Sequence, residues 1–321
     1  MGAWYQAPTF LLTPVQSINE TIMKNLSASP FRKAKAIQGM LSIVPVMVII
    51  LFTRLYPMVS SIYRSFTNWD GLYRNDWVGF KNYIVIFTDS PFWTLLRNSM
   101  VLLLSVPLQI LIGLFIAVLL YEEVKGWQVF RTLIYLPQIV SAVTIGYLFR
   151  IAFGLEGPVN IILQTLNLGK YAIEWLGNTW TALAVLVFCL TWFSIGWQAI
   201  VILGGMTRIP LDVFEAAKLD GATFFQRTFL IIVPMIGRTL EYAVIMSMVW
   251  TFTSVFAFIF AITNGGPGFE TTTIDYMIYT KFYQAGSNFG FATALAVILL
   301  LIIMVFTIIE MRVTNKASDW E

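Results

Sequence analysis

Six long apolar runs dominate the sequence, and each is long enough to cross a lipid bilayer as a helix. A transmembrane helix needs roughly 20 predominantly apolar residues to span about 30 Å of hydrocarbon. The runs, bounded by charges or by Gly, Pro and Asn clusters, cover approximately residues 40–66, 98–120, 132–153, 180–205, 240–263 and 291–311. They predict an all-α membrane protein with about six transmembrane helices.

Composition excludes several other classes of protein. The chain is 58% hydrophobic and only 12% charged, about half the charged fraction of a soluble domain. That balance argues against a water-soluble fold, a disordered chain and a nucleic-acid-binding protein. The only cysteine is Cys189 and there is no histidine, so an intrachain disulfide, a metal cluster and histidine-based catalysis are not expected.

The positions of Lys and Arg predict the orientation of the chain in the membrane. With the N-terminus inside, the segments on the cytoplasmic side hold twice as many Lys and Arg residues as those outside. We therefore expect both termini in the cytoplasm, and we expect kinks at the prolines inside the runs, Pro45, Pro57, Pro107 and Pro137.

The chain is expected to divide into two parts, a cytoplasmic N-terminal segment at 1–39 and a transmembrane domain at 40–321. In the first part, Trp4 and Tyr5 with the basic cluster at 32–35 suit an interfacial helix on the inner leaflet. A mobile tail followed by a basic stop is an equal alternative. The first apolar run is expected to act as its own signal anchor.

An unusually long charged loop, at about 206–238, separates the fourth and fifth runs. Asp212 and Glu215 have the D-x-x-E spacing of a capping box, which predicts a short helix starting at Val213. Asp220 and Gly221 form a helix stop, since glycine suits the left-handed conformation that ends helices. An amphipathic connector whose glutamate only caps a helix would show the same features.

The same loop resembles the EAA motif of permease subunits of bacterial binding-protein-dependent ABC importers. The pattern E-A-A-x3-G-x9-I-x-L-P is matched from Glu215 through Gly221 and Ile231 to Pro234, with Val233 in place of the usual leucine. Further similarities to the carbohydrate branch of that family are Tyr-Pro at 56–57, Val-Gly-Phe-Lys-Asn-Tyr at 78–83 and Thr-Asn-Gly-Gly-Pro at 263–267. The resemblance covers the chain from about Leu41 to its end and points to the maltose/glycerol-phosphate/alginate type.

This resemblance implies a type I ABC importer permease fold with a cytoplasmic coupling helix that docks on an ATPase subunit. It assigns ATPase coupling to Glu215, Ala216, Ala217, Asp220, Gly221, Phe224 and Pro234. It also implies several partners, namely a second homologous permease, two ATPase subunits that carry ATP and Mg, and a periplasmic or lipid-anchored binding protein. The expected location is the bacterial inner membrane.

No ATP-binding G-x-x-x-x-G-K-[ST] motif occurs in the chain, so we expect no cofactor and no ATPase site of its own. Polar residues inside spans usually face the bundle interior or water, which makes them candidates for the substrate path. These candidates are Trp192, Ser194, Trp197, Gln198, Trp250, Thr251, Ser254 and Gln138. Such a lining suits a neutral or weakly charged saccharide. The resemblance to maltose-type permeases favours Trp192, Gln198 and Ser254 among them.

Three other functions remain as alternatives at this stage. An ion-coupled secondary transporter would need an intramembrane charge relay, whereas the spans hold little beyond Arg54. A membrane-embedded enzyme would need converging acids, bases or metal ligands. A non-transporting scaffold would keep the spans but gives no reason for the loop pattern around Glu215 and Gly221.

Overall fold

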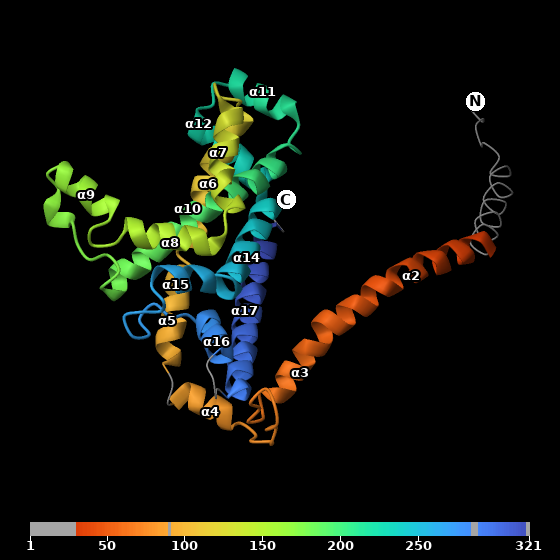
Figure 1. The fold of residues 1–321 in the computed structure, drawn as a ribbon. Coiled ribbons are helices and arrows are strands. Elements are labelled where there is room, and N and C mark those ends of the chain that lie inside the picture. Colours follow the sequence, from red (N-terminus) through yellow and green to blue (C-terminus); the bar gives the residue numbers. More distant parts are fainter. Residues whose placement is uncertain (1–29, 89–90, 284–287, 319–321) are drawn as a thin grey trace, which may run out of the picture. The chain divides into compact units, whose positions relative to one another are not determined.

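The structure of the chain is a computed structural model that describes residues 30–88, 91–283 and 288–318, with side chains described for 38–88, 91–283 and 288–312. The expected interfacial helix around Trp4 and Tyr5 lies outside the described residues. The described chain divides into two compact units, one ending at Ser60 and one starting at Ser61. All the sites described below belong to the second unit (Figure 1).

Most described residues are helical, and several long helices are apolar enough to cross a membrane. Four stretches meet this test by length and composition: Gln38–Arg64, Phe92–Tyr121, Thr179–Met206 and Phe289–Arg312. They are built from α2 (Pro30–Ile50), η1 (Leu51–Leu55), α3 (Tyr56–Arg64), α5 (Phe92–Leu102), α6 (Ser105–Tyr121), α10 (Thr179–Met206) and α17 (Phe289–Ser318). Two bent pairs of helices bring the number to six if each pair is one span.

The remaining elements are the bent pairs and the shorter helices that join the spans. The bent pairs involve α7 (Trp127–Ile139), α8 (Ala142–Ala152), α12 (Phe224–Gln226), η3 (Arg227–Ile232), α13 (Val233–Met235) and α14 (Gly237–Thr253). The joining helices are α4 (Lys81–Thr88), α9 (Pro158–Thr165), η2 (Gly169–Tyr171), α11 (Leu211–Leu219), α15 (Phe256–Ile262) and α16 (Ile274–Tyr283). In the described chain, β-structure is limited to an isolated bridge between Thr67 and Trp77.

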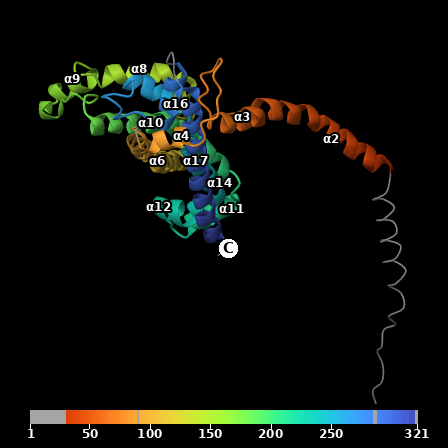
Figure 2. The same ribbon diagram turned by 90° about the horizontal axis from the view of Figure 1, so that it is seen from below.

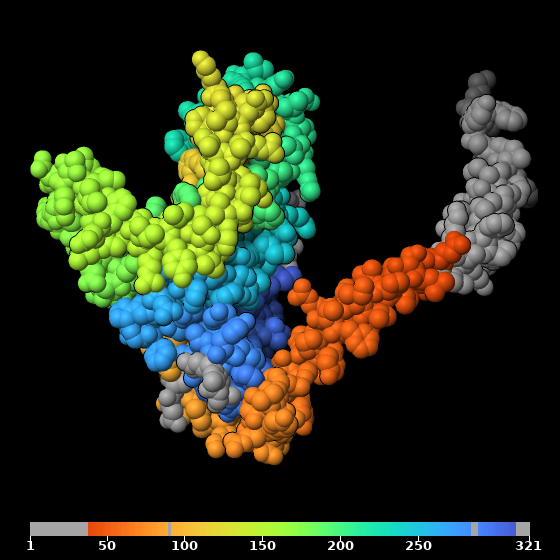
Figure 3. All heavy atoms as spheres, in the orientation of Figure 1, coloured from red at the N-terminus to blue at the C-terminus, as the bar shows by residue number. Residues whose placement is uncertain are grey.

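The run at 132–153 is broken three residues after Pro137, one of the prolines at which a kink was expected. Val140 and Ser141 adopt extended backbone angles, with ψ of 145° and 135°, and the axes of α7 and α8 differ by 97° across them. The space-filling view shows α7 and the α8 to α9 segment leaving the body in different directions (Figure 3). Hydropathy records composition only, so a break of two residues within an apolar run leaves no trace in it.

The fifth run, at 240–263, is likewise divided between two helices. Helix α14 ends at Thr253, and Ser254, with φ of −137°, separates it from α15. Helix α15 then packs against α8, which brings together the two short helices that follow the two breaks (Figures 1 and 2).

Two prolines explain the π-helical turns η1 and η3. Proline has no backbone N–H, and its ring clashes with the carbonyl four residues earlier. The residue before each proline instead donates to a carbonyl five residues back: Tyr56, which precedes Pro57, donates to Leu51, and Val233 donates to Thr228. The wider turn lets the helix continue past the proline, as π-bulges do elsewhere.

Helix α10 is the central packing element of the second unit, with α6, α7 and α14 in contact with it. At Gly196 the backbones of α10 and α7 lie in close contact, because a Cβ added to this glycine would lie 2.4 Å from the carbonyl oxygen of Ile134. Small residues at such crossings let membrane helices pack through their backbones. A side chain at Gly196 would therefore push α7 and α10 apart.

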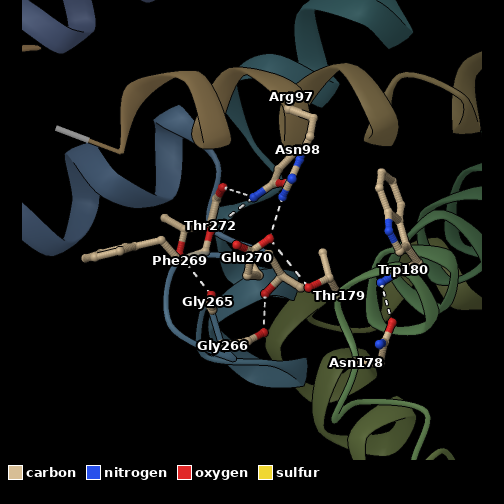
Figure 4. A network of polar contacts seen from close by, with 11 residues as sticks. Arg97, Asn98, Asn178, Thr179, Trp180, Gly265, Gly266, Phe269, Glu270 and Thr272 are labelled. Atoms are coloured by element: carbon tan, nitrogen blue, oxygen red, sulfur yellow. Dashed lines mark hydrogen bonds and ion pairs between the residues drawn. The ribbon is translucent and has the colours of Figure 1, made fainter. Parts of the chain in front are cut away.

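A clamp of polar side chains joins the middle of α5 and the start of α10 to the loop between α15 and α16 (Figure 4). Arg97 Nη2 lies 2.5 Å from Glu270 Oε2, and Thr179 Oγ1 donates to the same oxygen at 3.4 Å. Asn98 is fully buried, and its Nδ2 donates to the carbonyls of Phe269 at 3.1 Å and Thr272 at 2.8 Å. This clamp holds three separate segments of the chain at one end of the bundle.

Asn98→Ala should destabilise the protein, because the loop carbonyls of Phe269 and Thr272 lose their buried donor. An unsatisfied buried polar group costs about 1–3 kcal/mol, so a clear fall in the melting temperature is expected. The measurement is thermal unfolding of the purified chain in detergent. Asn75→Ala, the same change at an exposed residue, is the matched control. Equal melting temperatures for both variants would show that the clamp does not hold the loop.

Candidate functional site

A cavity of about 410 Å³ opens between α10 and α14, with α6 and α7 completing its walls. We call it the α10–α14 cavity. It is lined by Gln109, Gln138, Ser194, Trp197, Gln198, Tyr242, Met246, Ser247, Val249, Trp250, Thr253 and Ser254. Its volume falls within the range of roughly 300–1,000 Å³ that is common for small-molecule sites. Among the described residues, no acidic or basic side chain lines it.

Six of the eight residues expected on a substrate path line this one cavity. They are Gln138, Ser194, Trp197, Gln198, Trp250 and Ser254. Gln138 lies two residues before the break that follows α7, and Ser254 is the residue at the break that follows α14. The cavity therefore lies where the two helices are interrupted.

Trp192 and Thr251 are placed elsewhere. Trp192 packs on Phe149, with ring centroids 5.7 Å apart. Trp197 follows five positions later, which puts the two side chains about 140° apart around the helix. Thr251 is 2% exposed, and its hydroxyl donates to the carbonyl of Ser247 at 2.8 Å. Neither side chain lines the cavity.

The six remaining lining residues are Thr253, a polar residue of the fifth run, and five that were not anticipated from the sequence: Gln109, Tyr242, Met246, Ser247 and Val249. Gln109 was detectable, because it is an amide in the middle of the apolar run at 98–120. The other four lie on α14 with Trp250. The sequence does not show which face of α14 points toward α10, so these residues could be identified only from the structure.

Hydrogen bonds fix the amide of Gln198, which is 2% exposed. The hydroxyl of Ser247 donates its only hydrogen to the carbonyl of Ala243 at 2.8 Å. It must therefore accept from Gln198 Nε2, with which it is in hydrogen-bond contact. This leaves Gln198 Oε1 as the free acceptor, and it has no partner among the described residues. Gln138 Oε1 is buried without a described partner as well.

Trp250 presents a flat aromatic surface at the cavity. Phe193 stacks on it with an interplanar angle of 12° and ring centroids 6.0 Å apart, and Phe258 meets it edge to face. These contacts hold the indole in one orientation. Trp197, 42% exposed, is the second indole of the lining.

The second candidate region is the loop of α11, α12, η3 and α13. The expected capping box at Asp212 and Glu215 is wrong, as is the expected start at Val213. Helix α11 begins at Leu211 after Pro210, whose rigid φ of −58° leads into the helix without a side-chain cap. The capping box is instead formed by Thr223 and Gln226 at the start of α12.

Gly221 ends α11 in the left-handed conformation, with φ of 71°, as expected from the sequence. Its N–H donates to Lys218, and the N–H of Ala222 donates to Ala217, which is the paired pattern of a Schellman motif. A Cβ added to Gly221 would meet nothing within 4 Å. Any cost of substitution at this position therefore comes from the backbone angle.

Helix α11 has one buried face and one exposed face. Phe214 and Ala217 are buried, and Phe214 packs on Tyr121 at the end of α6 with ring centroids 4.7 Å apart. Glu215, Ala216 and Leu219 are exposed, Leu219 by 88%. The helix is thus anchored to the ends of the spans and presents its other face outward.

A second cavity, the loop cavity, has a volume of about 550 Å³ and lies between α11 and the ends of α6, α7 and α10. Its lining includes Glu215 and Lys218 from α11 and the ion-paired Arg227 and Glu122. The pair ties η3 to the turn after α6.

The other residues assigned to ATPase coupling fall along the same loop. Asp220 caps the end of α11, and Phe224 stacks on Phe115 of α6 with ring centroids 6.3 Å apart. Pro234 is exposed in α13, just before the 80° bend into α14. The structure thus gathers the seven residues on one loop, and their role in coupling stays a prediction.

Comparison with known proteins identifies the family. The profile described as "binding-protein-dependent transport system inner membrane component" matches residues 109–317. Similar curated proteins include the probable ABC transporter permease protein YurN of Bacillus subtilis, 31% identical over 87% of this chain and 96% of that protein. The multiple sugar-binding transport system permease protein MsmF of Streptococcus mutans is 30% identical over 85% of this chain and 93% of its own length.

Solved structures give the same fold. A chain from a bacterial ABC transporter involved in the import of the acidic polysaccharide alginate superposes with a TM-score of 0.72 at 22% identity. The match covers 89% of this chain and 96% of that one. Since the family profile and the similar permeases both extend over most of the sequence, the chain belongs to the family of inner membrane components of binding-protein-dependent transport systems, as a permease subunit.

Proposed function

We propose that this chain forms half of the translocation path of an ATP-driven importer of saccharides. The observation that carries the substrate class is the uncharged α10–α14 cavity, with its two indoles, three glutamines and several hydroxyls. Aromatic faces pack on the C–H faces of sugar rings, and amides and hydroxyls bond sugar hydroxyls. The similar proteins include a trehalose/maltose transport system permease of Thermococcus litoralis, 29% identical over 92% of this chain.

In this proposal, the loop of α11 to α13 faces the cytoplasm and docks on an ATPase subunit. Helix α11 supplies an exposed contact face, and Phe214 anchors the helix to Tyr121 of α6. A displacement of α11 by the ATPase would therefore be transmitted to the membrane-spanning helices. Its neighbour Phe224 adds a second anchor on Phe115. A second permease would complete the path, and two ATPase subunits would bind ATP and Mg.

At the opposite end of the bundle, the clamp around Arg97 and Glu270 faces the outside in this orientation. There a periplasmic or lipid-anchored binding protein would deliver the saccharide. One of the similar solved structures is an alginate ABC transporter in complex with an alginate pentasaccharide-bound periplasmic protein. Both termini of this chain would lie in the cytoplasm.

The proposal is tested by tagging the chain and purifying it from its native membranes in mild detergent. Co-purification of a second permease and an ATPase is expected, with ATP hydrolysis stimulated by a sugar-loaded binding protein. A chain that elutes alone and hydrolyses no ATP in the eluate would instead favour a secondary transporter or a scaffold.

Gly221→Ala should weaken coupling to the ATPase. The left-handed conformation costs a residue with a Cβ about 1–2 kcal/mol, which lowers the population of the docking-competent loop roughly 5- to 30-fold. The measurements are the amount of ATPase that co-purifies and the rate of uptake. Gly204→Ala is the matched control, because a Cβ at that helical position also meets nothing within 4 Å. Wild-type coupling in Gly221→Ala would contradict the role of this joint.

Trp197→Ala should raise the KM for uptake about tenfold, because one of the two indoles of the cavity is lost. Trp192→Ala removes the same side chain from the same helix, outside the cavity, and should leave the KM near its wild-type value. The measurement is uptake of labelled saccharide by cells carrying each variant at equal membrane abundance. The reverse order of effects would place the substrate path on the other face of α10.

A further inference from the structure

We propose that the α10–α14 cavity selects neutral saccharides that donate hydroxyl hydrogens and excludes oligomers of uronic acids. This inference rests on the proposed function, because it specifies the substrate class of the same cavity. Two observations carry it: the absence of any cation from the described lining, and the free amide oxygens of Gln138 and Gln198.

The charge of the lining decides between neutral and acidic sugars. A carboxylate leaving water for a low-dielectric site needs a cation or several hydrogen-bond donors to offset its lost hydration. Helices α6 and α10, as bounded above, contain no charged residue at all. The cavity therefore offers a uronate no counter-ion from these two walls.

The other two walls give the same result. On α7, Arg131 lies two turns from Gln138 and lines the loop cavity instead. On α14, the charged residues are Arg238 and Glu241, and neither lines the cavity. A uronate inside the cavity would thus find no cation among the described lining residues.

The wall also offers acceptor oxygens without a described partner. One N–H of the Gln198 amide is engaged by Ser247, and the amide oxygens of Gln198 and Gln138 have no hydrogen-bond partner among the described residues. Both oxygens are covered in this conformation, but the terminal torsion of a glutamine is soft enough for the Gln138 oxygen to turn toward a ligand. An acceptor is matched by a sugar hydroxyl and repelled by an ionised carboxylate, which has no hydrogen to donate.

The test is uptake from a mixture of labelled trisaccharides by cells lacking the gene for this chain and complemented with it. The neutral probes are malto-, cello-, xylo-, galacto- and chito-trisaccharides, and the acidic probes are trimers of mannuronate, guluronate and galacturonate. Mass spectrometry of the cell contents after a short exposure identifies which probes enter only when the chain is present.

Entry of neutral probes alone is the expected result. Chain-dependent entry of any uronate trimer would overturn the inference while leaving the importer function standing. If no saccharide of either kind enters in a chain-dependent way, the proposed function itself fails, and the inference fails with it.

Variants of Gln138 provide the second arm. Gln138→Met keeps the length of the side chain and removes the acceptor, so uptake of the neutral probe should fall about tenfold. Gln138→Glu adds an unpaired anion and should reduce uptake further, by at least a hundredfold. Gln128→Met, the same change at an exposed residue earlier in α7, should leave uptake unchanged.

Membrane abundance and ATPase co-purification of each variant separate a transport defect from a folding defect. Wild-type uptake by a well-assembled Gln138→Glu would show that charge in this cavity is tolerated, and would overturn the inference.

Discussion

Hydrocarbon cannot solvate a backbone N–H or C=O group, so every interruption of a membrane helix must be satisfied by other parts of the protein. The described chain interrupts its apolar helices in two ways. At Pro57 and Pro234 the preceding residue reaches a carbonyl five positions back, and the helix continues. After α7 and after α14 the helix stops, and the short helices α8 and α15 pack on each other beyond the breaks.

These two breaks also explain where the candidate site lies. An unbroken bundle closes its interior with side chains, whereas Gln138 and Ser254 stand at interruptions and bring polar groups to a common space beside α10. The same α10 and α14 extend to the loop end of the bundle, where α11 is anchored through Phe214. The α10–α14 cavity and the loop that carries α11 are therefore connected through the same helices.

Sequence reasoning predicted part of this organisation. The apolar runs, the left-handed Gly221 and six of the cavity residues could be inferred, because each depends on local chemistry or on polar residues within an apolar run. A kink near Pro137 was expected, but neither the full break at Val140 nor the break at Ser254 could be inferred, since hydropathy does not record where a helix stops within an apolar run. That Trp192 lies outside the cavity could not be inferred, because composition gives the depth of a residue but not the direction of its side chain around the helix. The capping box was assigned to Asp212, although it lies at Thr223. Both residues are followed three positions later by a side chain with an acceptor oxygen, so the spacing alone does not distinguish them. Helix α11 starts after Pro210 without a side-chain cap.

The contact at Gly196 has a consequence for how selectivity can diverge among related permeases. Since α10 meets α7 through its backbone at this residue, the width of the cavity between Gln138 and Trp197 is set by main-chain contact. Mutation cannot narrow that distance further and can widen it only by separating the helices. Substitutions of the lining side chains would therefore change the chemistry of the cavity within a frame of constant dimensions, which makes the cavity a favourable target for redesign by point substitution.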